Sequence, residues 1–182
     1  NPFCQMPAEG SRYNTVHAAT VRNLCVYLNE KKLIKDITSV GVTTPYKAQQ
    51  LFISDLLKEF ELKDVVSGTV HRFQGDQKDI VIFDIPDSEG VFPSQLIDAT
   101  SSRAQGSKLM NVAFSRSKDI LIVFANVSYL QERLPATSIL RNLLADMQTK
   151  GKVIDVKEII KLGPFSLPSR PNFTPKTNIN IK

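Results

Sequence analysis

Two polar segments of this 182-residue chain carry residue types that suit the binding of an anionic ligand. The first, Thr69–Asp79, reads TVHRFQGDQKD and lies between two runs rich in Val and Ile, residues 65–70 and 79–85, that are typical of strands buried on both faces. Loops at the carboxyl ends of strands in open α/β sheets are where ligands bind, so this loop is a candidate site for an anion or a nucleotide. Taken alone, it is equally well interpreted as a solvated hairpin loop.

The second segment, Asn111–Lys118, reads NVAFSRSK and contains an arginine at the junction of two expected elements. Apolar residues at helical spacing predict a short helix over residues 108–115, and a strand is expected over residues 120–125, so Arg116 lies at the end of the helix beside the strand. A planar, permanently charged guanidinium held in this way can stabilise a transferring phosphoryl group. For a lone Arg the alternatives are capping of helix carbonyls and pairing with Asp119.

Three motifs, in order along the chain, resemble those of superfamily 1 helicases. TTPYKAQ (Thr43–Gln49), TVHRFQGDQKDIVIF (Thr69–Phe83) and MNVAFSRSKDILIVFAN (Met110–Asn126) are similar to motifs IV, V and VI of the 5′-to-3′ branch. That branch includes the nonsense-mediated-decay RNA helicase and its DNA-replication relatives. SRYNTVHA (Ser11–Ala18) resembles the Asn-containing segment that precedes motif IV, so the similarity covers about residues 11–150. These motifs belong to the second RecA-like domain of the motor.

The resemblance implies roles for five residues of motifs V and VI. Arg116 matches the arginine finger, which reaches the γ-phosphate of ATP held by the first RecA-like domain. Gly75 and Gln77 match positions near the phosphates and the ribose. Thr69 and His71 match positions that touch the backbone of a single-stranded DNA or RNA.

Motif IV and the segment before it add further expectations. Tyr46 and Gln49 match motif IV, which implies contacts with the nucleotide and places the Tyr46 ring near its base. Gln77 stands where the family usually has Glu, and an amide is a weaker acceptor for ribose hydroxyls than a carboxylate. His17 stands where relatives often have Glu, and at the start of a helix we expect its side chain to be exposed.

A phosphate-binding loop of its own is missing from the sequence. No G-x-x-x-x-G-K-[ST] occurs, and the Gly151-Lys152 pair is followed by Val153 and lacks the loop that would surround the phosphates. The resemblance therefore implies that ATP and Mg²⁺ are held mostly by the first RecA-like domain of the same polypeptide, and no metal site is expected here. The apolar run Ile80–Phe83 ends in Asp84, which we interpret as structural because no bound metal or phosphate is expected beside it.

Composition is compatible with one globular domain. Hydrophobic residues make up 42% of the chain, enough for a core, while a net charge of +5 and a pI near 9.2 permit a polyanionic partner without requiring one. The two cysteines, Cys4 and Cys25, have no zinc or disulfide pattern around them, which suits a reducing compartment. We expect a cytoplasmic protein, or a nuclear one in a eukaryote, with no membrane partner, and the start at Asn1 suggests a cut from a longer polypeptide.

The fold class expected is α/β, with a RecA-like, largely parallel sheet flanked by helices and right-handed crossovers. Residues 1–10 are expected to be a lead-in, residues 11–162 the domain, and residues 163–182, which are rich in proline, a tail or linker. Residues 86–105 are expected to form a mobile insertion between motifs V and VI. The remaining expected elements are a helix around Val21–Leu28, a strand over Ser39–Thr44, a helix around Ile53–Phe60, a short helix containing Tyr129 and Leu130, and a helix around Ile139–Met147.

The sequence therefore indicates the C-terminal motor domain of an ATP-dependent superfamily 1 DNA or RNA helicase. Such a domain contributes an arginine finger and part of the single-strand path to an ATP site between two domains, so we expect this chain alone to be inactive. The alternative is a non-catalytic module that keeps the RecA-like fold for nucleic-acid or protein binding.

Overall fold

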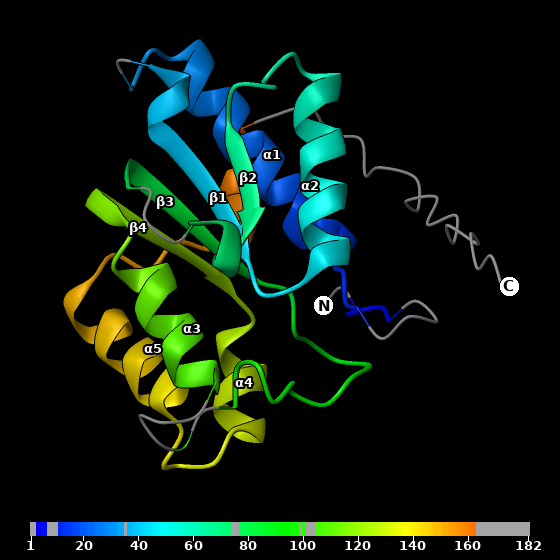
Figure 1. The fold of residues 1–182 in the computed structure, drawn as a ribbon, viewed down its shortest axis with the longest axis vertical. Helices are drawn as coiled ribbons and strands as arrows, with labels where there is room; N and C mark the ends of the chain where they lie inside the picture. The colour runs from blue at the N-terminus through cyan, green and yellow to red at the C-terminus, as the bar shows by residue number, and fades with distance from the viewer. Residues whose placement is uncertain are drawn as a thin grey trace, which may run out of the picture.

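The computed structural model describes residues 3–6, 11–34, 36–73, 77–98, 100 and 105–162, with His71 and Gln105 described in their backbone only. Within these residues the chain forms one four-stranded parallel sheet with helices on both faces (Figure 1). This is the three-layer α/β arrangement that alternating strands and helices predict. The expected tail, residues 163–182, lies outside the described residues.

The strands run in the order β2-β1-β3-β4 across the sheet. They are β1 (Val40–Thr44), β2 (Val66–Thr69), β3 (Lys78–Ile85) and β4 (Ser117–Ala125). The connection after β1 leads outward to β2, and the connection after β3 leads outward to β4 on the opposite side. The carboxyl ends of β1 and β3 therefore border the crevice at which ligands bind in open α/β sheets.

Helices cover the two faces of the sheet in separate groups (Figure 1). One face packs against α1 (Thr15–Glu30), α2 (Lys47–Glu59) and α6 (Val156–Ile160). The other packs against α3 (Gln105–Phe114), α4 (Val127–Arg133) and α5 (Ile139–Lys150). A 3₁₀ turn, η1 (Ile37–Ser39), precedes β1, and a second, η2 (Val70–Phe73), follows β2.

The core divides in two because side chains alternate between the faces of a strand. Ile80 and Ile82 of β3 pack with α1 and α2, while Phe83 and Ile85 pack with α3, α4 and α5. β3 is buried on both faces from Ile80 onward, as its Val- and Ile-rich sequence predicts. β2 and β4 lie at the edges of the sheet and are only partly buried, so the expectation of a fully buried strand is wrong for β2.

The connection from β2 to β3, residues 70–77, is the short crossover. It passes from the carboxyl end of β2 over β1 to the amino end of β3, and Phe73 is its buried anchor at 1% exposure. Two glycines admit the Phe73 ring: an added Cβ would lie 2.7 Å from Phe73 Cε1 at Gly41 and 3.0 Å from Phe73 Cε2 at Gly68. Larger residues at these positions would lift the chain off the sheet. The two Gly residues thus let Phe73 pack directly on the sheet within the described part of this crossover.

The sequence predictions of the main elements are confirmed, and three features differ. Helix α6, which has five residues, was not expected, because so short a helix shows little periodicity. Within the expected mobile insertion, residues 86–88 and Ile97 are buried against the domain, with Asp87, Ser88 and Ile97 at 0% exposure. Within the expected lead-in, Cys4 is buried and Gln5 forms an antiparallel bridge with Tyr13.

Candidate functional site

The amino end of the sheet brings the end of motif V beside motif VI. The Lys78 amide donates a hydrogen bond to the Arg116 carbonyl at 3.0 Å, and Lys78 and Ser117 are partners in the register of β3 and β4. Gln77, immediately before β3, is exposed at the same end of the sheet. Lys118 Nζ lies 3.4 Å from Asp79 Oδ1 across the two strands. Two cations and an exposed amide thus gather where the sequence predicts phosphate contacts.

Arg116 is held by its backbone, while its side chain keeps most of its hydrogen-bonding capacity. Its Nε and Nη2 donate to Ser115 Oγ at 3.3 and 3.0 Å. Among the described residues no carboxylate pairs with the guanidinium, so the expected alternative of an Arg116–Asp119 ion pair is not observed. A neutral hydroxyl is an easily replaced partner, and the fork remains able to bind an anion bidentately.

Thr69, the motif V residue expected to contact nucleic acid, lies at the carboxyl end of the sheet. Thr69 ends β2, is half-buried, and is level with Thr44 of β1. Lys47 and Arg72 are exposed close to these strand ends along the chain. A hydroxyl with nearby cations suits the phosphates of a nucleic-acid backbone, which need no base-specific contact. The His71 side chain and Gly75 lie outside what the structure describes.

The crevice between the carboxyl ends of β1 and β3 is filled by the chain itself. The Arg12 guanidinium lies 5.5 Å from the centroid of the Tyr46 ring and forms an ion pair with Asp87. Burial raises the pKa of Tyr46, and the neighbouring Asp87 raises it further. Burial also raises the pKa of Asp87, against the opposing effects of Tyr46 and Arg12. Tyr46 is 5% exposed and lies at the opposite end of the sheet from Gln77 and Arg116.

Gln49 is also turned into the protein. Its Nε2 donates to Asp84 Oδ2 at 2.6 Å, and its Oε1 accepts from the Asn14 amide at 2.8 Å. His17 Nδ1 lies 2.7 Å from Asp84 Oδ1, and His17 is 7% exposed, so the expectation that His17 is exposed is wrong. The physical reason is Asp84, which is buried at the end of β3 and has hydrogen-bonding capacity for both side chains. This bonding fits the structural role expected for Asp84.

Residues 11–14 also complete the start of α2. Its first residue is preceded by Tyr46, which forms no side-chain cap, and Ser11 Oγ instead accepts from the Ala48 amide at 2.9 Å. Asn14 caps α1, since its Oδ1 accepts from the Val16 and His17 amides at 3.1 and 3.2 Å. These hydrogen bonds fix the start of α2 against residues 11–14, while the parallel strands place Tyr46 and Arg116 at opposite ends of the sheet.

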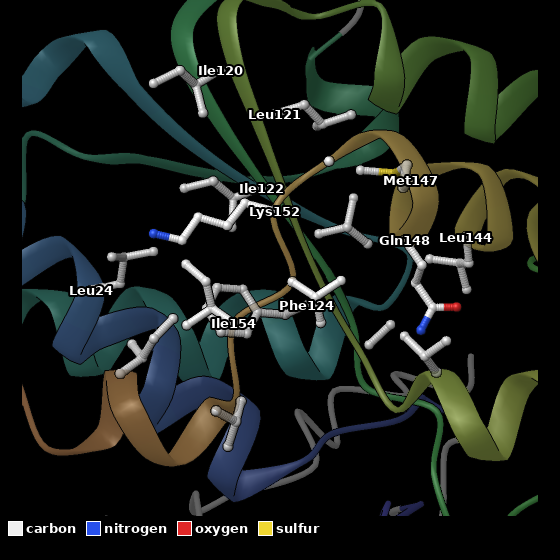
Figure 2. Close-up of a pocket in the computed structure, with 17 residues that line it drawn as sticks. Leu24, Ile120, Leu121, Ile122, Phe124, Leu144, Met147, Gln148, Lys152 and Ile154 are labelled. Atoms are coloured by element: carbon white, nitrogen blue, oxygen red, sulfur yellow. The ribbon is translucent and has the colours of Figure 1, made fainter.

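An apolar pocket along β4 is unsuited to a nucleotide. It is an apolar groove of about 480 Å³ along β4, where Leu121 lies on the side of Met147 of α5 and Ile120 and Ile122 lie on the opposite side of the strand (Figure 2). Lys152 is the one charged residue that lines it. A triphosphate needs several hydrogen-bond donors or cations, so a nucleotide site is better placed at the two ends of the strands than in this groove.

The described part of the chain contains no cluster of three metal-binding side chains. It also contains no helix long and apolar enough to cross a membrane.

A family of protein domains described as "AAA domain" matches residues 4–128 of this chain. The match covers α1 through the start of α4 and so includes every strand of the sheet. Both ends of the strands described above lie within it.

Curated relatives also match the chain. It is 30% identical over 123 residues to the DNA polymerase alpha-associated DNA helicase A of Saccharomyces cerevisiae, which covers 67% of this chain and 17% of the relative. It is 31% identical over 140 residues to the DNA replication ATP-dependent helicase/nuclease DNA2 of Bos taurus, covering 70% and 12%. It is 30% identical over 118 residues to the RNA helicase Mov10l1 of Homo sapiens, covering 64% and 10%. The chain thus spans less than a fifth of each of these relatives.

Proposed function

Since the chain belongs to the AAA domain family, as a RecA-like domain of the 5′-to-3′ branch of superfamily 1 helicases, we propose that residues 11–162 are the C-terminal motor domain of an ATP-dependent DNA or RNA helicase. Its substrates, its partner domain and its ATP turnover are parts of this proposal, because the chain covers only 10–17% of the helicases it resembles.

One observation carries the proposal: the Lys78–Arg116 backbone hydrogen bond joins motif V to motif VI at the amino end of the sheet. Motif V begins at Thr69, at the carboxyl end, and the short crossover brings it back to Lys78. The two ends of the sheet are roughly 25 Å apart, the length of the eight-residue strand β3. The stretch from Thr69 to Lys78 therefore connects a candidate contact with the nucleic-acid backbone at one end to a candidate nucleotide contact at the other.

At the amino end, we assign Arg116 to the γ-phosphate and Gln77 to the phosphates and ribose. Gly75, which lies outside the described residues, is assigned to the same ligand on the resemblance alone. The guanidinium fits this role because its only described polar partner is the Ser115 hydroxyl, which an anionic oxygen replaces without breaking an ion pair. Lys118, two residues after Arg116, is paired with Asp79, so Arg116 is the cation assigned to the phosphates. ATP would supply the phosphoanhydride, and these residues would bind and orient its phosphates from one side. Mg²⁺ and the remaining contacts are assigned to the first RecA-like domain.

At the carboxyl end, Thr69 and His71 are assigned to the sugar–phosphate backbone of a single strand. Backbone contacts carry no sequence information, so binding is expected to be independent of sequence. Tyr46 and Gln49 were expected to touch the nucleotide, but their burial against Asp87 and Asp84 supports a different role. We propose that they position the end of β1 and the start of α2.

The proposal is tested by replacing Arg116 in the full-length protein that contains this chain. Arg116→Ala is expected to lower ATP turnover by roughly 10³-fold or more while leaving single-strand binding nearly unchanged, because arginine fingers act on the transition state. Arg116→Lys should also turn over poorly, since an ammonium lacks the planar fork. Lys63→Ala, which removes an exposed cation before β2, is the matched control. Parental turnover in both Arg116 variants would reduce this residue to a structural one.

The isolated chain provides a second test. Without a phosphate-binding loop it is expected to show no ATPase activity above background. Turnover by the purified chain that is abolished by Arg116→Ala would show a complete site within it. If the full-length protein binds single strands but never hydrolyses ATP, the non-catalytic binding module is the correct interpretation.

A further inference from the structure

An exposed aromatic pair lies beyond the carboxyl end of β3. Phe92 is 78% exposed, the largest exposure among the large hydrophobic residues that the structure describes, and Phe3 is 65% exposed. The two belong to adjoining segments, because the Phe3 Cδ1 would lie 3.3 Å from a Cβ built on Gly90. Single exposed apolar side chains are ordinary on a protein surface, so a binding role for Phe92 depends on how it is held and on what lies beside it.

The turn that carries Phe92 is anchored on two sides. On one side the Cys4 amide donates to the Glu89 carbonyl at 2.9 Å. On the other, the Tyr129 hydroxyl donates to the Val91 carbonyl. Gly90 provides the reversal of the chain with a φ of +96°, a conformation that suits glycine. Phe92 is therefore displayed on a fixed backbone, as a rigid contact surface requires.

A small pocket adjoins the Phe92 ring. It has a volume of about 230 Å³ and is lined on one side by residues 89–92 and on the other by Tyr129 and Arg133 of α4. Arg133 supplies a cation whose only described ion-pair partner is the neighbouring Glu132, at 3.5 Å. The Glu89 carboxylate in the same pocket accepts hydrogen bonds from Asn126 and Ser88, at 3.0 and 2.5 Å. An exposed ring beside a guanidinium suits a flat, π-bonded group that stacks on it.

The position on the sheet relates this surface to the proposed single-strand path. Thr69 ends β2 at the level of Thr44 in β1, and Thr43 in β1 is level with Phe83 in β3. The residues that follow β3 therefore leave the sheet at its carboxyl end, where the path of the single-stranded nucleic acid is proposed. We propose that Phe92, with Arg133 lining the same pocket and Phe3 on the adjoining segment, forms a base-stacking platform that extends the single-strand path beyond Thr69. This inference rests on the proposed function, and it adds a contact to bases where the Thr69 end contacts only the backbone.

The platform makes predictions that differ from those of an apolar protein-binding surface. Stacking tolerates every base, so it increases affinity without adding sequence preference, and it depends on a ring at position 92. Replacing Phe92 with Ala should weaken binding to all sequences, and Phe92→Tyr should preserve binding. Leu33→Ala is the matched control, because Leu33 is also exposed, at 60%, but lies between α1 and β1, toward the amino ends of the strands.

The experiment measures binding of the full-length protein to labelled single strands of several unrelated sequences by fluorescence anisotropy. Phe92→Ala is expected to lower affinity about 5-fold or more, the effect of losing one base stack, and Leu33→Ala to leave affinity unchanged. A strand with one abasic site, moved along its length, then locates the stacked base. At that position the abasic strand should weaken binding of the parent protein as much as Phe92→Ala weakens binding of the intact strand. The Phe92→Ala variant should bind the abasic and the intact strand equally well, because both changes remove the same contact.

Two results would overturn the platform: parental affinity in Phe92→Ala, or a loss that adds to the abasic loss at every position. Thr69→Ala, measured in the same series, separates this inference from the proposed function. If Thr69→Ala weakens binding and Phe92→Ala does not, the strand path stands and the platform is wrong. If neither variant changes affinity, the strand path at this edge is wrong as well.

Discussion

Gly41→Ala tests whether the short crossover is held down by packing on the sheet. A Cβ at position 41 would lie 2.7 Å from Cε1 of Phe73 and 2.9 Å from Cγ of Lys78. The lysine stem is able to turn away, but the Phe73 ring is 1% exposed and is surrounded by close-packed neighbours. The added methyl group must therefore displace the ring or the backbone that carries it.

Two opposing effects decide the sign of this substitution. Gly41 does not have a positive φ, so alanine fits the backbone and, by restricting the unfolded chain, would stabilise the protein by about 0.4–1 kcal/mol. Overpacking of a filled site costs about 1–3 kcal/mol. The contact of 2.7 Å is shorter than real Cβ contacts, so overpacking should exceed the entropic gain. We expect a net destabilisation of about 0.5–2 kcal/mol.

The assay is urea unfolding of the 182-residue chain, in which a lower midpoint at unchanged slope reports lost stability. Gly68→Ala is the matched control, because its Cβ would lie 3.0 Å from the same ring and should cost less. Phe73→Leu should rescue part of the loss in the Gly41→Ala background, with a coupling of at least about 0.5 kcal/mol. A stabilised Gly41→Ala variant, or effects of Gly41→Ala and Phe73→Leu that simply add, would refute packing as the anchor of the crossover.

Two further predictions concern buried polar and thiol groups. Asp84→Ala should cost about 2–4 kcal/mol in urea unfolding, because Gln49 Nε2 and His17 Nδ1 lose a buried partner, and Asp84→Asn should cost less because it keeps one acceptor. Comparable midpoints for the two variants would contradict this reasoning. Burial raises the pKa of Cys25 from 9.0 to about 12, so its alkylation at pH 8 should be very slow until urea unfolds the chain. Because the pKa of the Cys25 thiol is higher in the folded chain than in the unfolded one, its contribution to the free energy of unfolding is complete below pH 9 and is lost as the pH rises toward 12. Rapid alkylation of the folded chain would refute the burial of Cys25. A urea midpoint that does not fall between pH 9 and pH 12 would refute it as well.

The layers of the fold were predictable because the relevant signals are local. Val- and Ile-rich runs predicted β3, and apolar residues at helical spacing predicted α1, α2 and α5. The order of the strands has no such signal, since it depends on which face each crossover takes. For that reason the sequence did not show that β2 lies at an edge of the sheet.

The candidate site was predictable only where motif and strand end coincide. Gln77 and Arg116 each come directly before an expected strand, so the motifs placed both residues at strand starts, and the pairing of β3 with β4 brings those two starts together. The surroundings of Tyr46 and Gln49 depend instead on residues 11–14, which are distant in sequence and occupy the crevice that the motif alone would leave to a ligand. Position in a motif indicates which strand end a residue follows, but whether its side chain is free depends on hydrogen bonds formed across the whole sheet. The buried His17 illustrates the same dependence, because only the acceptor at the end of β3 explains why a helix-start histidine points inward.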